Sequence, residues 1–177
     1  MKRELGAGFS GNILDIAPAP TLSRFIHENF PKADYKTADL YMKDVDYHMD
    51  IMDMNCLENE SIDFFICSHV LEHVRDDRKA MCELHRVLKK TGCGILVVPI
   101  DLTQLEIDED PDCTDVGERW RRFGQNDHVR MYSREGYLKR LKEAGFRVLQ
   151  YQKEYFGTQA MYENALTETA TVYIVAK

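Results

Sequence analysis

The chain has 177 residues, of which 44% are hydrophobic and 30% are charged, and these proportions are typical of one globular domain. No apolar run approaches the roughly 18 residues that a membrane-spanning helix needs, and the N-terminal residues contain no apolar segment typical of a signal peptide. The net charge of −7 argues against nucleic-acid binding, which depends on a basic surface. We therefore expect a single domain over residues 1–177 with neither a nucleic-acid nor a membrane partner.

The cysteines are scattered and form no C-x-x-C pair, which argues against a disulfide framework or a cysteine metal site. Several lie among apolar neighbours, as buried thiols do. The five are Cys56, Cys67, Cys82, Cys93 and Cys113. This usage predicts a reducing environment and a cytoplasmic location.

The first third of the chain alternates between strand and helix patterns. Residues 12–17 (NILDIA) form a short apolar run that stops at two prolines, which predicts a buried strand. Helical spacing of apolar residues then predicts a helix over 21–30, with Thr21 as its N-cap. Residues 34–40 and 45–51 read as a second strand and a short third strand.

The middle of the chain continues the alternation. Residues 61–68 (SIDFFICS) are almost continuously apolar, as expected for a strand covered on both faces. After Asp76 an amphipathic stripe of Met81, Leu84 and Leu88 predicts a helix that ends before Gly92. Residues 92–99 form a fifth strand that Pro99 terminates.

The last part begins with an acidic segment, residues 100–118, which we expect to be a loop. A helix is predicted from Ser133 to a C-cap at Gly145, followed by strands over 146–152 and 171–177. Strands that alternate with helices imply βαβ units. The sequence therefore predicts a doubly wound α/β fold with a mostly parallel, seven-stranded sheet in a three-layer α/β/α arrangement.

Acidic residues end three successive predicted strands. Asp15, Asp39 and Asp50 occupy these positions, and Asp39 follows Asp15 by a little over twenty residues. In a doubly wound sheet, ligands bind outside the carboxyl ends of the strands, and an acidic residue at the second strand commonly accepts hydrogen bonds from ribose hydroxyls. The alternative is that Asp39 and Asp50 cap turns. Taken together, the three carboxylates favour an adenosine-bearing ligand.

The segments ILDIAPAP, YKTADL, DI and SIDFFICSHVLEHVRDDRKAMCELHRVLKKTGCGILVVPI resemble the core of class I S-adenosylmethionine-dependent methyltransferases. The chain is most similar to the type 11-like group, whose signature reads FD-x-V, VLEHV-x-D and E-x-x-RVLKPGG. The resemblance extends from Ile13 to Ile100 and continues more weakly through residues 123–146. It implies a Rossmann-like methyltransferase fold and S-adenosyl-L-methionine as the cofactor.

The resemblance also implies a set of cofactor-binding residues. Asp15, Ala17 and Ala19 face the methionine part, Asp39 binds the ribose and Leu40 packs on the adenine. Asp50 approaches the adenine amino group, with Asp53 as a competing choice, and Ile51 contacts the ring. Ser68 and His69 line the cleft near the sulfonium. The methionines at 42, 49, 52 and 54 either line the adenine region or fill gaps in the core.

Two departures of this chain from the family concern its first loop and its N-terminus. The first loop of the family is usually rich in glycine, which allows a close backbone approach and positive φ. Here Ala17 and Ala19 stand in that loop, with Pro18 and Pro20 beside them. The sequence also begins just before the first strand, so we expect N-terminal lid helices to be absent from the domain.

The stretch His69-x-x-Glu72-His73 also matches the H-x-x-E-H pattern of one class of zinc peptidase. In such an enzyme both histidines lie within one helix. Here His69 directly follows an apolar strand, and helical periodicity starts only near Asp76. The sequence therefore predicts no metal site.

The remaining polar groups leave alternatives open. In the GQNDHVRMY segment, His128 or Arg130 either meets the methyl acceptor or belongs to a hydrogen-bonded loop that caps the helix at Ser133. The RWRRFG segment (119–124) is either a solvated basic turn or a site for an anionic substrate. The acidic residues 106–115 form a solvated loop or chelate a cation.

The sequence thus predicts a transferase of the methyltransferase class that acts on a small-molecule acceptor. His69 and His128 are the candidate general bases, because a neutral imidazole is available near pH 7. The alternative is a non-catalytic module that binds S-adenosylmethionine or S-adenosylhomocysteine, or that serves in an assembly. A nicotinamide-dependent dehydrogenase is disfavoured because no G-x-G-x-x-G follows the first strand.

Overall fold

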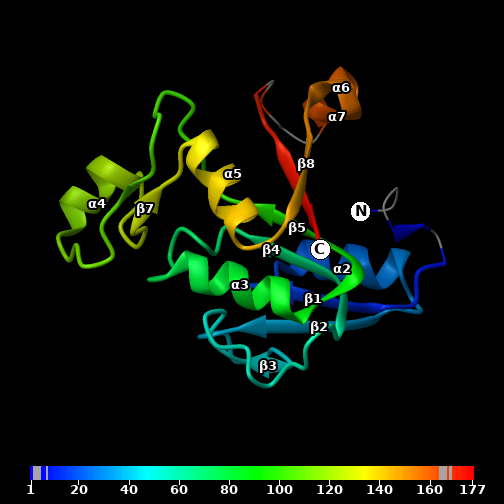
Figure 1. Cartoon of the computed structure of the whole chain (residues 1–177). Helices are drawn as coiled ribbons and strands as arrows, with labels where there is room; N and C mark the ends of the chain where they lie inside the picture. Colours follow the sequence, from blue (N-terminus) through cyan, green and yellow to red (C-terminus); the bar gives the residue numbers. More distant parts are fainter. Residues whose placement is uncertain (2–4, 7, 164–166, 168) are drawn as a thin grey trace.

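The computed structural model describes residues 1, 5–6, 8–163, 167 and 169–177. Its centre is a seven-stranded sheet with the strand order β3-β2-β1-β4-β5-β9-β8 (Figure 1). The strands are β1 (Asn12–Ile16), β2 (Asp34–Asp39), β3 (Tyr47–His48), β4 (Ile62–Ser68), β5 (Leu88–Val97), β8 (Arg147–Tyr151) and β9 (Val172–Ala176). Neighbouring strands from β3 to β5 are parallel, and β9 runs antiparallel to β5 and β8. The strand order reverses between β1 and β4, where doubly wound sheets bind their ligands.

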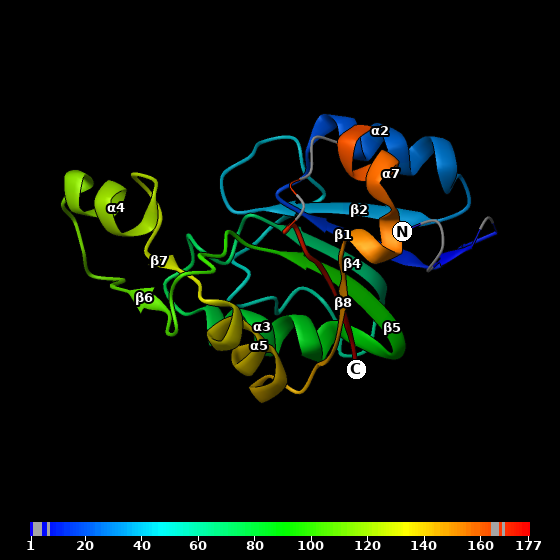
Figure 2. The ribbon, with the colours of Figure 1, turned by 90° about the horizontal axis from the view of Figure 1, so that it is seen from above.

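Helices cover both faces of the sheet and complete three layers (Figure 2). α3 (Asp77–Val87) and α5 (Arg134–Glu143) lie on one face, and α2 (Pro20–Asn29) and α7 (Thr158–Glu163) lie on the other. This arrangement confirms the predicted α/β/α architecture. Among the residues that the structure describes, no helix has the length and apolar character needed to cross a membrane.

The central strands are buried because their side chains alternate between the two helical layers. Leu14 of β1 and Phe65 of β4 belong to the core cluster that includes the apolar residues of α3 and α5. Their neighbours Ile13 and Phe64 pack with Ile26 of α2. All five side chains are fully buried. Each contributes about 1.5–3 kcal/mol of apolar burial, so β1 and β4 form a rigid support for the residues at their ends.

Three predicted helix ends differ from the structure. Thr21 is not the N-cap of α2: Ala19 holds that position and makes no side-chain capping bond, and Pro20 is the first helical residue. Proline fits there because the first helical N–H needs no partner. Leu88, predicted within a helix, begins β5 instead. The C-cap of α5 is Ala144, and Gly145 follows it with φ 98°.

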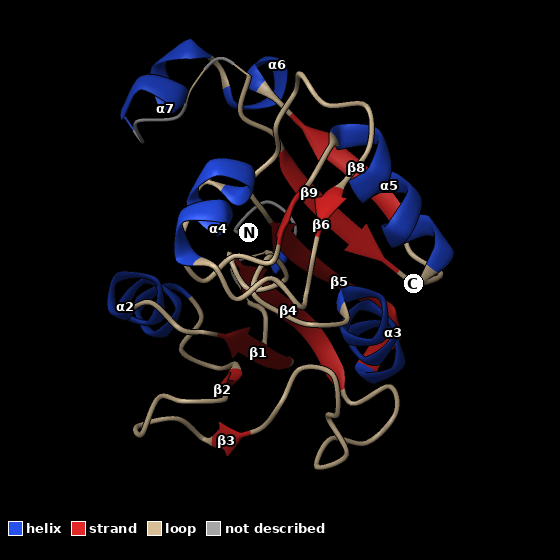
Figure 3. Ribbon diagram, turned by 90° about the vertical axis from the view of Figure 1, so that its left-hand side faces the viewer, coloured by secondary structure: helices blue, strands red, loops and turns tan. Residues whose placement is uncertain are grey.

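The acidic segment is more ordered than predicted. It contains β6 (Asp108–Glu109) and the start of α4 (Val116–Phe123), and β6 pairs antiparallel with β7 (Arg130–Met131). Asp115 caps α4 by accepting a 2.7 Å hydrogen bond from the Glu118 N–H, so the RWRRFG stretch is the end of a helix and not a basic turn. Figure 3 shows α4 and β6 in front of the sheet, on the side where β5 ends. The short helix α6 (Lys153–Phe156) and α7 were also not predicted.

Candidate functional site

A cavity of about 580 Å³ opens where the carboxyl ends of β1, β2 and β4 meet, and we call it the strand-end cavity. The predicted site residues that line it are Ala17, Asp39, Leu40, Asp50, Ile51 and His69. Met49 and Met52 also line it, whereas Met42 and Met54 do not. The lining residues that were not predicted are Ile16, Ala38, Tyr41, Val70, His73, Val74, Arg75 and Asp127. The volume lies within the range of small-molecule sites.

Several predicted residues lie outside the lining of the strand-end cavity. They are Asp15, Ala19, Ser68, His128 and, of the Asp50 and Asp53 alternatives, Asp53. Asp15 is buried within β1, and Ala19 precedes the first turn of α2. His73 and Asp127 were missed as lining residues. His73 belongs to the H-x-x-E-H pattern, and Asp127 is the neighbour of the candidate base His128. The sequence offers no other signal that either residue lines the cavity.

The carboxylates of Asp39 and Asp50 each combine two roles. Oδ1 of Asp39 accepts hydrogen bonds from the N–H groups of Tyr41 (2.6 Å) and Met42 (2.8 Å). Oδ1 of Asp50 accepts one from Met52 N–H (2.8 Å). Within the described residues the Oδ2 atom of neither carboxylate has a recorded partner. Each aspartate therefore caps a turn, as the alternative predicted, and still has one oxygen available to a ligand.

Two residues at the edge of the cavity have left-handed backbone conformations. Ala17 follows β1 with φ 54°, and His69 follows β4 with φ 56°. Each is held by a backbone bond, from Ala17 N–H to Ala38 O (2.9 Å) and from His69 N–H to Val97 O (2.8 Å). This conformation costs a residue with a Cβ about 1–2 kcal/mol. Ala17 thus supplies the backbone geometry that glycine would give without cost, although the glycine itself is absent.

His69 forms a dyad with a buried carboxylate. Its Nδ1 lies 3.1 Å from Glu72 Oε1, and because the carboxylate can only accept, Nδ1 carries the proton. The imidazole is 61% exposed in the cavity wall, whereas the Glu72 side chain is completely buried. The hydrogen bond that His69 donates to Glu72 raises the pKa of His69, and partial burial opposes this shift. The geometry leaves Nε2 of His69 free to accept a proton.

The GQNDHVRMY segment mainly anchors the loop between β4 and α3. Arg130 is 1% exposed and its guanidinium donates to the carbonyl oxygens of Leu71 (2.5 Å), Val74 and Arg75 (3.0 Å). Ser133 caps α5 by accepting a 3.1 Å bond from Gly136 N–H, as the hydrogen-bonded-loop alternative predicted. Arg130 therefore holds the segment that carries Val74 and Arg75 in the wall of the cavity.

Asp15 is an acid buried at the centre of the sheet. It is 1% exposed, and its Oδ2 accepts a 2.7 Å hydrogen bond from the Tyr35 hydroxyl. Burial raises the pKa of Asp15 from its ordinary value of 3.8 to about 6, and the bond from Tyr35 opposes this shift only in part. The ionised carboxylate is therefore held at a cost to stability.

Because of this cost, we expect Asp15→Asn to raise the free energy of unfolding by an amount that depends on pH. As pH rises from about 4 to about 6, the unfolded chain loses the Asp15 proton while the folded chain keeps it, so the free energy of unfolding of the parent falls. The asparagine retains an acceptor for Tyr35 and has no charge. We expect urea unfolding to show Asp15→Asn about 3 kcal/mol more stable than the parent at pH 7.5, and close to it at pH 4.

Asp44→Asn removes the same charge from an exposed loop and controls for the change in net charge. A stability difference between Asp15→Asn and the parent that stays constant from pH 4 to pH 7.5 would contradict the assignment of the cost to Asp15.

The sequence matches a known family over more than half of its length. Residues 4–96 match the family described as "Methyltransferase domain". No curated protein sequence matches the chain significantly.

Solved structures with the same fold include proteins from distant organisms. A chain of the complex between the Haloferax volcanii Trm112 methyltransferase activator and its methyltransferase partner superposes with a TM-score of 0.66, at 15% identity over 99% of this chain and 87% of that one. An S-adenosylmethionine-dependent methyltransferase from Mesorhizobium loti gives 0.64 at 15% identity over 97% and 92%. A phosphoethanolamine N-methyltransferase from Haemonchus contortus, in complex with phosphomonomethylethanolamine and S-adenosylhomocysteine, gives 0.62 at 14% identity over 99% and 51%.

Proposed function

The chain belongs to the methyltransferase-domain family, and from this premise we propose that it is an enzyme that transfers a methyl group from S-adenosylmethionine to a small-molecule acceptor. The cofactor of the class I methyltransferases is S-adenosylmethionine. The observation that carries the proposal is the strand-end cavity, where two carboxylates, a left-handed alanine and an imidazole meet at the point of strand reversal. We propose that residues 1–177 act as one domain.

The residues of the cavity fit the parts of the cofactor. The available oxygen of Asp39 suits a ribose hydroxyl, and that of Asp50 suits the adenine amino group. Leu40, which is 49% exposed, and the side chain of Ile51 offer apolar surface to the adenine ring. Ala17 has no side chain beyond Cβ, so the methionine part can approach its backbone closely. Asp15 and Ser68 would act from just behind the lining.

The bound cofactor supplies an activated methyl group, so the protein contributes alignment and the exclusion of water. We assign the acceptor side to His69, because it is an exposed imidazole in the cavity wall. Glu72 fixes the Nδ1 proton and ring orientation, and Nε2 can then take a proton from an acceptor that must lose one. His128, the other candidate base, is 7% exposed and does not line the cavity, so we assign it no proton transfer.

Calorimetric titration with S-adenosylmethionine and with S-adenosylhomocysteine tests the proposal. We expect micromolar binding of both ligands, followed by release of S-adenosylhomocysteine when acceptors are screened. His69→Gln should leave cofactor affinity within about threefold and lower turnover by about 100-fold or more on an acceptor that must be deprotonated. Binding without turnover on any acceptor would favour the non-catalytic module, and no binding by a folded sample would refute the site.

A further inference from the structure

The loop after β4 meets the segment before β7 in a cluster of potential metal ligands. Glu72, His73 and His128 each offer one ligand atom, and these atoms lie within 4.8 Å of one another. A backbone hydrogen bond from Val129 N–H to Glu72 O (2.9 Å) joins the two segments directly beside the cluster. Two hydrogen-bonded segments therefore bring together residues that are remote in the sequence.

Both histidines of the cluster have an oxygen acceptor beside Nδ1, as metal ligands do, and His128 is hydrogen-bonded to it. His128 Nδ1 lies 3.0 Å from Phe123 O, and His73 Nδ1 lies 3.3 Å from Asp127 Oδ2. A carbonyl can only accept, so Nδ1 of neutral His128 carries the proton and Nε2 has the lone pair. The Asp127 carboxylate, which lies within ion-pair distance, favours the same tautomer in His73. Metal-binding histidines are oriented in this way, with the second ring nitrogen donating to a carbonyl or carboxylate.

Glu72 supplies an independent observation that points to a ligand. Its side chain is completely buried, Oε1 accepts from His69, and Oε2 has no hydrogen-bond partner among the described residues. A buried carboxylate oxygen without a partner is costly and rare in native proteins. A cation beside His73 and His128 would satisfy this oxygen and leave the bond to His69 intact.

We propose that Glu72, His73 and His128 bind a divalent transition metal of the zinc class directly behind the part of the strand-end cavity that His73 lines. Two imidazoles and a carboxylate suit Zn²⁺ and leave a fourth position open. Tetrahedral zinc places its ligand atoms about 3.4 Å apart, so the cluster must contract slightly on binding. His73, whose side chain is 32% exposed and lines the cavity, has the freedom to move. The sequence did not predict this site because His128 lies far from the H-x-x-E-H pattern.

Titration with metal alone tests the site without any methyl transfer. After treatment with a chelator, the whole protein should bind one Zn²⁺ by calorimetry and one Co²⁺ by its visible absorption, both in the absence of S-adenosylmethionine. We expect His73→Gln and His128→Gln each to weaken Zn²⁺ binding at least 100-fold. Asp127→Asn, which leaves the ligands in place, should weaken it about 10- to 100-fold.

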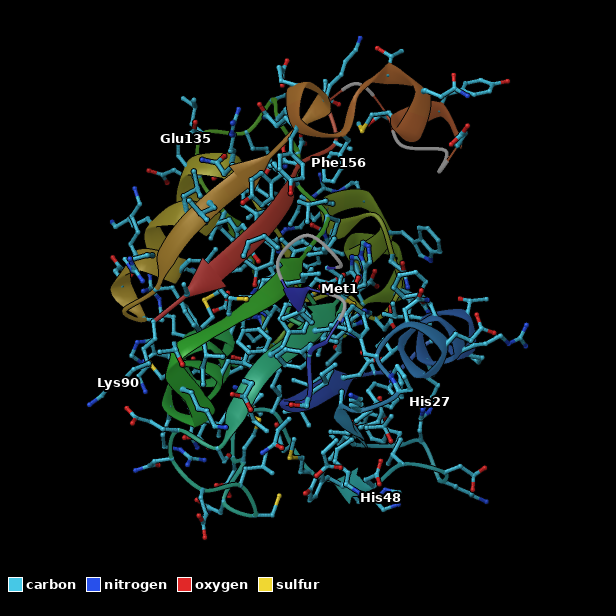
Figure 4. The ribbon with its side chains drawn as sticks, turned by 90° about the vertical axis from the view of Figure 1, so that its right-hand side faces the viewer. Met1, His27, His48, Lys90, Glu135 and Phe156 are labelled. Carbon is cyan, nitrogen blue, oxygen red and sulfur yellow. The ribbon has the colours of Figure 1, made fainter. Side chains whose placement is uncertain are left out.

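His48→Gln is the matched control, because His48 lies on β3 at the far edge of the sheet (Figure 4) and should leave Zn²⁺ affinity unchanged. Glu72→Gln should also lose binding, and if that buried change prevents folding, the partly exposed His73 still decides the question. Absence of saturable binding overturns the proposal. Binding that persists in both histidine variants also overturns it and indicates exposed thiols such as Cys56 and Cys82.

Discussion

The Asp39→Ala variant should bind S-adenosylmethionine about 10- to 100-fold more weakly than the parent. Asp39 is the last residue of β2, and it lines the strand-end cavity. Hydrogen bonds to a charged acceptor contribute about 1.5–3 kcal/mol each, and the available oxygen of Asp39 can receive at least one from the ribose. Loss of the turn that Oδ1 caps will also displace Leu40 and Tyr41. Calorimetry at constant pH and salt measures the change.

Two further variants separate ligand binding from turn formation. Asp39→Asn keeps an oxygen for the N–H groups of Tyr41 and Met42 but loses the charge and one acceptor, so its affinity should fall between those of the parent and Asp39→Ala. Asp101→Ala is the control for turn formation. The Asp101 carboxylate accepts a 2.8 Å hydrogen bond from Thr103 N–H in a similar turn, and it lies outside the lining of the cavity. Parent-like affinity in Asp39→Ala would remove Asp39 from the cofactor site, and parent-like affinity in Asp39→Asn would reduce its role to the turn.

The sheet could be predicted from the sequence because burial on both faces leaves a simple pattern. β1 and β4 are runs of apolar residues, and every predicted strand of the main sheet is present. Strand ends follow from these runs, so the places of Asp39, Asp50 and His69 at the cavity could be inferred as well. Periodicity can be read within a short window of residues, and the topology follows from the alternation of strands and helices along the chain.

The α4 region was missed because its charged composition hides its order. The spacing of Asp115 and Glu118 is an N-terminal helix signal, and Gly124 has the left-handed conformation typical of a helix end. The residues that give these signals can be read from the sequence. The many acidic residues favoured a loop over a helix in the prediction, although charged side chains are ordinary on an exposed helix of this kind.

The support of the cavity wall could not be predicted because it depends on backbone atoms. Arg130 binds three carbonyl oxygens of a loop more than fifty residues earlier in the chain, and carbonyl groups carry no residue-type signal. The left-handed φ of Ala17 is similarly invisible, since alanine seldom adopts it. Sequence patterns thus indicate which strand ends meet, whereas the contacts that fix the intervening loop emerge only from the folded structure.

The Arg130→Ala variant should lose about 3–5 kcal/mol of its free energy of unfolding, the usual cost of removing one partner from a buried charged network. Besides the three carbonyl groups, Arg130 Nε lies 3.3 Å from Glu109 and 3.8 Å from Asp77, and both carboxylates also pair with Arg140. Removal of the guanidinium leaves buried acceptors without donors. The loop that forms the cavity wall loses its anchor, so affinity for S-adenosylmethionine should fall together with stability.

Urea unfolding and calorimetry of the same samples measure both effects. Arg130→Lys keeps the charge but not the planar set of donors, so it should recover only a small part of the stability. Arg121→Ala is the matched control, because its side chain is 69% exposed and its ion-pair partner within the described part of the chain is Glu118 on the same helix. We expect this variant to lose less than about 0.5 kcal/mol. If Arg130→Ala loses less than about 1 kcal/mol, or keeps full cofactor affinity, then the loop holds its position without Arg130, and the apolar contacts of Leu71 with the core must position the cavity wall.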